Sequence, residues 1–145
     1  MFSIYNNQDL MDQLIAAHNS KKLHHANLIY GGAGEDPLPV ALSLAAMLLC
    51  ETETACGTCR NCKRVEKLEH PDLNFTFPFV SGGNSGTSDD FLQDFRRAVL
   101  KNPFLDPDSW QRQITSKNQQ LQIPVKEIQN LQQKLSLTAA EGGNR

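Results

Sequence analysis

The chain has 145 residues, the size of about one domain, and its 14 Lys and Arg against 16 Asp and Glu give a formal charge of −2. That balance excludes a basic nucleic-acid cradle acting alone. The longest apolar run, residues 40–50, is interrupted by Ser43 and is too short to span a bilayer. The amino terminus lacks the basic and apolar regions of a secretory signal, so we expect a cytoplasmic protein with no membrane partner.

The first part of the chain predicts a helix, a strand, a glycine loop and a second helix, in that order. Residues 7–19 carry apolar side chains at three- and four-residue spacing, which is typical of an amphipathic helix. Residues 26–30 are a short apolar run stopped by glycines, the pattern of a buried strand that feeds a turn. An apolar helix should begin near Pro37 or Pro39, where a first turn tolerates proline, and continue through Leu49 as a buried element.

A second strand is predicted in the middle of the chain. A short helix over residues 63–69 and a turn at His70-Pro71-Asp72 lead into residues 73–80, which alternate at period two. Pro78 favours an edge position for this strand, because proline cannot donate to a ladder. Residues 81–90, rich in Gly, Ser and Asp, predict a flexible loop.

Further helices are predicted towards the carboxyl end. Residues 91–100 have helical spacing, and a short helix that carries Trp110 has Asp106 or Asp108 as its cap. We interpret Trp110 and the 91–100 helix as core packing. Residues 119–123 predict a weak strand.

The last predicted helix spans residues 124–135. Its apolar residues share one face and are Val125, Ile128, Leu131 and Leu135.

All four cysteines are crowded into one short segment with the spacing Cys50-x5-Cys56-x2-Cys59-x2-Cys62. Zinc in a structural site takes four tetrahedral ligands, and C-x2-C turns present two thiolates to one ion, so we expect a structural Zn²⁺ here. A full set of protein ligands leaves no position for water, which favours a structural over a catalytic metal. Four nearby basic residues would offset the negative charge of the thiolates: Arg60, Lys63, Arg64 and Lys67.

Other interpretations of the cysteines stay open. They are a C-x-x-C redox pair, a disulfide knot, buried cysteines without a ligand, and an iron–sulfur cluster. The first of these would belong to a redox protein, and a metal with a position open to water would belong to a zinc-dependent enzyme.

The glycine loop has the context of a phosphate-binding loop, G-x-x-x-x-G-K-[ST], but not its chemistry. With Gly31 as the first glycine, the lysine position holds Pro37 and the hydroxyl position holds Leu38. Glu35 and Asp36 add two negative charges where phosphates would sit, and Pro37 removes a backbone donor. Neither nucleotide binding nor hydrolysis is expected. The degenerate phosphate loop consists of Gly31, Gly34, Asp36, Pro37 and Leu38.

These features together resemble a known family. Residues 23–31 (LHHANLIYG), the helix after them and residues 48–75 (LLCETETACGTCRNCKRVEKLEHPDLNF) are similar to the first domain of the bacterial clamp-loader subunits, the gamma/tau and delta-prime subunits of DNA polymerase III. The cysteines and the His-Pro-Asp turn carry the resemblance, and residues 123–131 resemble the family's next helix. The resemblance covers about residues 9–143 and departs from the family over 79–120.

The resemblance implies an α/β, P-loop NTPase-like (AAA+) fold. In that fold helices flank a parallel sheet, and a four-cysteine zinc module follows the phosphate-loop helix. Residues 1–145 would form the N-terminal part of an AAA+ ATPase-like domain, with the zinc module at 50–62 and an insertion at 79–120. We expect the chain to be truncated before the Walker-B-type strand. A sheet left half built exposes an apolar edge, so such a fragment should self-associate.

The missing lysine makes the chain most similar to delta-prime. The implied function is a non-catalytic, stator-like subunit of the clamp loader, which loads the sliding clamp onto primed DNA. The implied partners are the gamma/tau and delta subunits, with the clamp and the DNA contacted through the assembled complex. The implied cofactor is structural Zn²⁺, and no ATP is expected. The alternatives are an ATP-binding, gamma/tau-type ATPase subunit and a zinc-dependent or redox protein.

Overall fold

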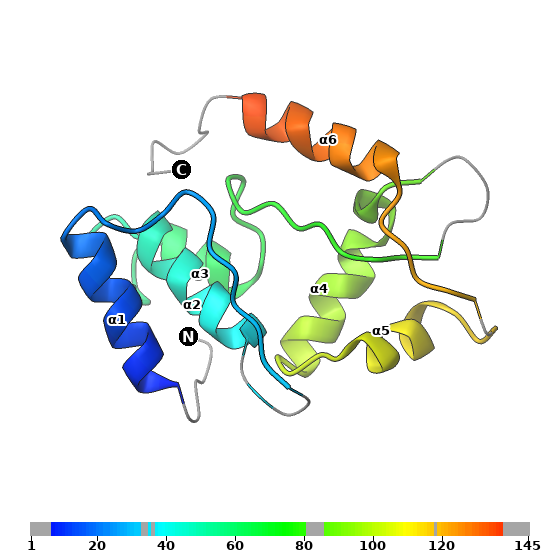
Figure 1. The fold of residues 1–145 in the computed structure, drawn as a ribbon, viewed down its shortest axis with the longest axis horizontal. Helices are drawn as coiled ribbons and strands as arrows, with labels where there is room; N and C mark the ends of the chain where they lie inside the picture. Colours follow the sequence, from blue (N-terminus) through cyan, green and yellow to red (C-terminus); the bar gives the residue numbers. More distant parts are fainter. Residues whose placement is uncertain (1–6, 33–34, 36, 81–85, 118, 138–145) are drawn as a thin grey trace.

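The computed structural model describes residues 7–32, 35, 37–80, 86–117 and 119–137 (Figure 1). Helices α1, α2 and α3 gather at one end of the molecule, and α4, α5 and α6 lie at the other. None of these helices has both the length and the apolar character that a membrane span needs. The elements in chain order are α1 (Gln8–Asn19), α2 (Pro37–Leu49), α3 (Arg60–Glu66), the 3-10 helix η1 (Ser88–Phe91), α4 (Leu92–Lys101), α5 (Pro107–Ile114) and α6 (Val125–Ser136).

The predicted helices are confirmed, and local capping accounts for the starts of α3 and α5. Helix α3 begins three residues before the predicted start, because Cys59 is its N-cap and the Cys59 sulfur accepts a hydrogen bond from the Cys62 amide. Asp106 caps α5 by accepting a hydrogen bond of 2.8 Å from the Ser109 amide. Helix α2 is buried along most of its length, as its nearly continuous apolar sequence predicts.

The predicted parallel sheet is not formed among the described residues. A strand exists only through hydrogen bonds to a neighbouring strand, and the backbone groups of residues 26–31 bond to no other described backbone group. Leu28 and Tyr30, predicted to be buried, are each 86% exposed. The described residues contain one isolated antiparallel β-bridge, which pairs Phe79 with Gln122.

Residues 73–80 are extended but are held by side chains instead of a ladder. Alternate residues face the core as period two predicts, with Phe77 5% exposed and Phe79 1% exposed. The Phe77 ring stacks on the Phe95 ring of α4, with centroids 4.1 Å apart, and meets the Trp110 ring of α5 edge-on at 5.3 Å. The indole N–H of Trp110 donates a hydrogen bond of 2.7 Å to the Pro78 carbonyl oxygen.

The 79–120 segment, predicted to be an insertion, supplies much of one hydrophobic cluster. Its residues Phe95, Ala98, Val99 and Trp110 pack in one cluster with Leu42 of α2, and with Leu68 and Phe77. Trp110 is 3% exposed, which confirms the expectation that it serves core packing.

A capping box forms at the start of η1. Of the segment predicted as a flexible loop, residues 81–85 lie outside the described residues, and Ser88 begins η1. Thr87 and Asp90 form a capping box, in which the Thr87 amide donates to the Asp90 carboxylate at 3.0 Å.

Helix α6 forms as predicted, but its apolar face is turned outward. Val125 is 75% exposed, Ile128 45% and Leu135 59%. The buried residue of α6 is Glu127, which is 1% exposed. Periodicity locates the apolar face of a helix and does not say which neighbour the helix meets.

Replacement of Phe95 by alanine should lower the free energy of unfolding by about 3–5 kcal/mol, because it empties the ring position stacked on Phe77. Urea denaturation followed by circular dichroism measures the change. Leu100→Ala on the same helix is the control, since Leu100 is 51% exposed and should cost about 0.5 kcal/mol or less. Equal losses in the two variants would show that the aromatic cluster does not hold the fold.

Candidate metal centre and glycine loop

The four cysteines converge between α2 and α3. Cys50 directly follows α2, Cys59 caps α3, and Cys62 lies in its first turn. The buried amide of Asn61 donates a hydrogen bond of 3.0 Å to the Leu49 carbonyl oxygen, which ties the start of α3 to the end of α2. The polypeptide between them turns tightly at Gly57, whose φ of +72° suits a residue without a Cβ.

The four sulfur atoms have the spacing of a tetrahedral metal site. All lie within 4.8 Å of one another. The Cys50 and Cys56 sulfurs are 3.6 Å apart, and the Cys56 and Cys62 sulfurs are 4.0 Å apart. An ion with metal–sulfur distances near 2.3 Å separates its sulfurs by roughly 3.8 Å, whereas a disulfide would need about 2.05 Å. The cluster could hold a metal ion, and its cysteines are free of disulfides.

Backbone amides and hydroxyl groups point at these sulfurs. The amides of Cys56, Cys59 and Cys62 donate to the sulfurs of Cys50, Cys56 and Cys59 at 3.5, 3.4 and 3.3 Å. The Thr58 hydroxyl donates to the Cys56 sulfur at 3.5 Å, and the Thr52 hydroxyl lies 3.3 Å from the Cys50 sulfur. Such donors stabilise thiolates, the form that binds metals.

The surroundings shift the thiol pKa values in different directions. Hydrogen bonds from the Thr58 hydroxyl and the Cys59 amide lower the pKa of Cys56 to about 7. Burial raises the pKa of Cys50, but hydrogen bonds from the Thr52 side chain and the Cys56 amide outweigh it, and the pKa falls to about 5. Burial raises the pKa of Cys62 to about 12. A cation among the four sulfurs would favour the thiolate of each.

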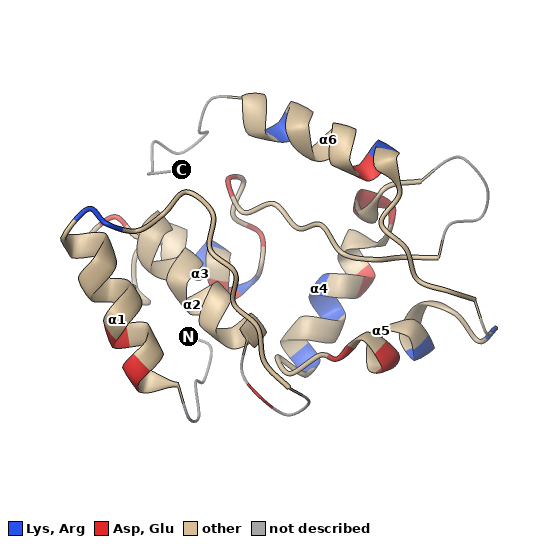
Figure 2. Cartoon of the chain, viewed as in Figure 1, with Lys and Arg blue, Asp and Glu red and all other residues tan. Residues whose placement is uncertain are grey.

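The basic residues predicted to offset the thiolate charge lie on or beside α3 (Figure 2). Arg60, Lys63 and Lys67 are exposed, and Arg64 is half-buried. Figure 2 also shows acidic stretches at the glycine loop and at the start of α5.

In the glycine loop, a carboxylate of the chain itself accepts a hydrogen bond from a loop amide. The Gly32 amide donates a hydrogen bond of 2.6 Å to Glu35 Oε2, and a Cβ built on Gly31 would lie 2.7 Å from that oxygen. An amide of a phosphate loop would instead donate to a phosphate. Gly34 and Asp36 lie outside the described residues.

The same loop borders a cavity of about 390 Å³ whose opposite wall is the 103–108 segment. Among the described lining residues the charged side chains are Glu35, Asp106 and Asp108, and none is basic. Hydrogen bonds from the Ser109 hydroxyl and amide hold the pKa of Asp106 below its usual range. Pro37 and Leu38 line the cavity where the family motif would place a lysine and a hydroxyl group. These carboxylates would repel a triphosphate.

Sequence reasoning brought together the cysteines and the loop but missed the opposite wall of the cavity. Asp106 and Asp108 were predicted only as candidate helix caps. They reach the glycine loop because the aromatic cluster packs α4 and α5 on the 73–80 segment, a contact between parts of the chain that are distant in sequence. We find no local pattern that could have indicated it.

The comparisons with known proteins all point to subunits of DNA polymerase III. A family model described as DNA polymerase III, delta subunit, matches residues 6–145. The chain is 39% identical over 71 residues to the DNA polymerase III subunit delta' of Bacillus subtilis (strain 168), which is 48% of this chain and 22% of that protein. It is 38% identical over 79 residues to the protein of the same name from Escherichia coli (strain K12), covering 51% of this chain and 23% of that protein.

A third relative, the subunit delta' of Yersinia pestis, is 38% identical over 65 residues, which is 41% of this chain and 18% of the relative. The matched segments thus span about a fifth of the length of these relatives. No solved structure matches the chain with comparable significance.

Proposed function

The chain belongs to the DNA polymerase III delta subunit family and is similar to its delta' members, and we propose that it acts as a non-catalytic, stator-like subunit of the clamp loader. In this role it works in the cytoplasm with the gamma/tau and delta subunits. It contacts the sliding clamp and primed DNA through the assembled complex. The chain has a structural role in the complex and does not hydrolyse ATP.

The observation that carries the proposal is the Glu35 carboxylate on the Gly32 amide. A working loop directs its amides at phosphate oxygens and adds a lysine and a Mg²⁺-binding hydroxyl. Here Pro37 and Leu38 take those two positions, and the cavity beside them is bordered by three carboxylates. The Glu35 contact, the two substituted motif positions and the three carboxylates each disfavour binding of a polyanion such as ATP. All of them lie at the glycine loop and its cavity.

Full-length protein should show no saturable, Mg²⁺-dependent binding of a fluorescent ATP analogue up to about 1 mM. Fluorescence anisotropy measures this, with an intact-loop ATPase of the same complex as the positive control. Glu35→Ala is the matched variant. It should also fail to bind, because it frees the Gly32 amide but restores neither the lysine nor the hydroxyl group. Micromolar binding by the parent protein would favour a gamma/tau-type ATPase subunit instead.

We further propose that Cys50, Cys56, Cys59 and Cys62 hold a structural Zn²⁺. The sulfur spacing and the amide donors support a closed tetrahedral set. Four protein ligands leave no position for water, so the metal would stabilise the connection between α2 and α3 and take no part in a reaction. Zinc binding would add directly to folding free energy in a segment with few buried apolar side chains.

Cys59→Ser should reduce zinc from about one ion per chain to a small fraction and lower the melting temperature, because the free energy of metal binding is lost from folding, while the serine hydroxyl can still cap α3. Mass spectrometry of the metal and calorimetry measure the two effects. Thr54→Ser, an exposed substitution in the same loop, is the control and should leave both unchanged. Unaltered zinc content and melting temperature in Cys59→Ser would contradict the assignment.

We propose that the 145-residue chain by itself self-associates through residues 26–31. These residues belong to no helix or strand, their backbone groups have no described backbone partner, and Leu28 and Tyr30 are each 86% exposed. An unpaired apolar segment of this kind is a template for pairing with another chain.

Sedimentation of the 145-residue chain should therefore show species larger than the monomer that increase with concentration. Tyr30→Lys should shift the distribution towards monomer, because a charge on an exposed edge disfavours pairing. Lys126→Ala, which changes an exposed charge on α6, should leave the distribution as it is. A parent chain that sediments only at monomer mass would exclude this association.

A further inference from the structure

The most deeply buried acidic side chain among the described residues is that of Glu127 on α6, which is 1% exposed. A buried carboxylate costs several kcal/mol unless hydrogen-bond donors surround it. Neither the glycine loop nor the cysteine cluster uses this residue. Its position therefore requires an account of its own.

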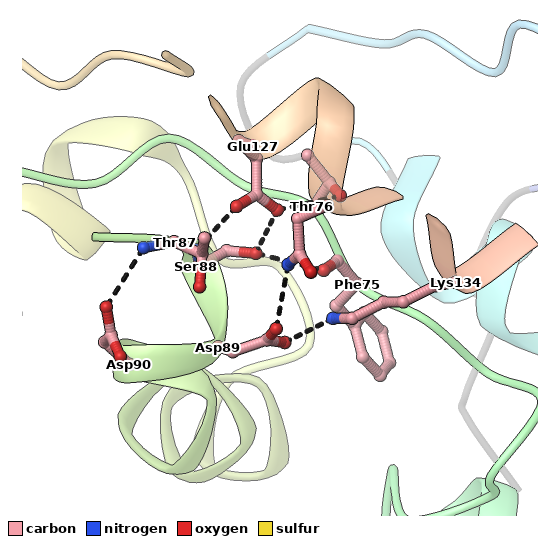
Figure 3. Close-up of polar contacts among 9 residues, drawn as sticks. Phe75, Thr76, Thr87, Ser88, Asp89, Asp90, Glu127 and Lys134 are labelled. Atoms are coloured by element: carbon pink, nitrogen blue, oxygen red, sulfur yellow. Dashed lines mark hydrogen bonds and ion pairs between the residues drawn. The ribbon is translucent and has the colours of Figure 1, made fainter. Parts of the chain in front are cut away.

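The donors come from two other parts of the chain (Figure 3). Ser88, the first residue of η1, donates through its amide to Glu127 Oε2 at 2.8 Å and through its hydroxyl to Oε1 at 2.5 Å. The Thr76 hydroxyl donates to Oε1 at 3.2 Å. One carboxylate thus joins α6, the start of the insertion and the extended 73–80 segment. We call Glu127, Ser88 and Thr76 the Glu127 latch.

A second set of polar contacts on the same side of α6 supports the latch. The Lys134 ammonium group and the Asn130 amide both donate to the Asp89 carboxylate. Burial raises the pKa of Asp89, but these two donors outweigh it and hold that pKa below its usual range. Glu127, Asn130 and Lys134 follow one another at three- and four-residue spacing, so a single polar face of α6 meets η1.

The latch explains why α6 lies with its apolar face outward. Val125, Ile128 and Leu135 are 75%, 45% and 59% exposed, so the hydrophobic effect by itself would favour a rotated helix. The polar contacts oppose that rotation, because turning α6 would leave the Glu127 carboxylate and the Ser88 amide without their partners.

We infer that Glu127 is a positioning residue: through the latch it fixes the insertion to α6 and determines which face of α6 points away from the molecule. The inference is independent of the proposed loss of nucleotide binding. It gives the insertion a second role besides completing the core, since η1 supplies two of the three hydrogen bonds to Glu127.

The test is an NMR comparison of Glu127→Ala and Glu127→Gln in the full chain. Two quantities are measured: hydrogen exchange of the Ser88 amide, and the relaxation that a soluble gadolinium chelate causes at the Ile128 and Leu135 methyl groups. Gln129→Ala, which changes an exposed residue of α6, is the matched control. The amide of Val99, in the aromatic core, reports general destabilisation.

Glu127→Ala should raise exchange of the Ser88 amide by at least tenfold more than exchange of the Val99 amide, and should lower the gadolinium effect at Ile128 and Leu135. Glu127→Gln should give a smaller change, because it keeps one acceptor oxygen and adds an N–H that can donate to the Ser88 hydroxyl oxygen. Gln129→Ala should match the parent protein.

Two results would overturn the inference. One is parental exchange and parental methyl relaxation in Glu127→Ala. The other is an equal rise in exchange at Ser88 and Val99, which would indicate a loss of stability without a positioning role. If Glu127→Ala does not fold, Ser88→Ala removes only the hydroxyl donor and carries the same comparison, and unchanged methyl relaxation in that variant counts against the latch.

Discussion

The contact between the rings of Phe77, Phe95 and Trp110 is the interaction on which the rest of the described structure depends. Residues 73–80 have no strand ladder along most of their length, so their course is fixed by what their side chains pack against. Phe77 lies against α4 and α5 and belongs to the cluster that includes Leu42 of α2. Without this contact, little would connect the two ends of the molecule.

This arrangement shows how residues 79–120 relate to the rest of the chain. The helices of this segment supply most of the buried side chains of the cluster that joins them to Leu42, Leu68 and Phe77. The same packing brings the 103–108 segment opposite the glycine loop. Residues 103–108 therefore form part of the surroundings of a loop that lies far away in the sequence.

The sequence was sufficient to predict the features that depend on neighbouring residues, such as helices. It was not sufficient to predict contacts between parts of the chain that are distant in sequence. Helices such as α2 and α5 follow from apolar runs and a capping aspartate, which act within a few residues. The convergence of the four cysteines was predictable because they lie within thirteen residues and C-x2-C turns bring their sulfurs together locally. Residues 26–30 have the composition of a strand, but pairing needs a neighbour that no local pattern can specify. The burial of Glu127 depends in the same way on donors brought by η1 and by Thr76.

Helix α2 has a consequence for how the two candidate sites relate. It begins at the glycine loop and ends next to Cys50, and at 1.5 Å per residue its 13 residues form a rod about 20 Å long. All of its residues are buried or half-buried, so it is packed on several sides. The cysteine cluster and the glycine loop therefore lie at the two ends of one packed helix, and the length of that helix sets the distance between them.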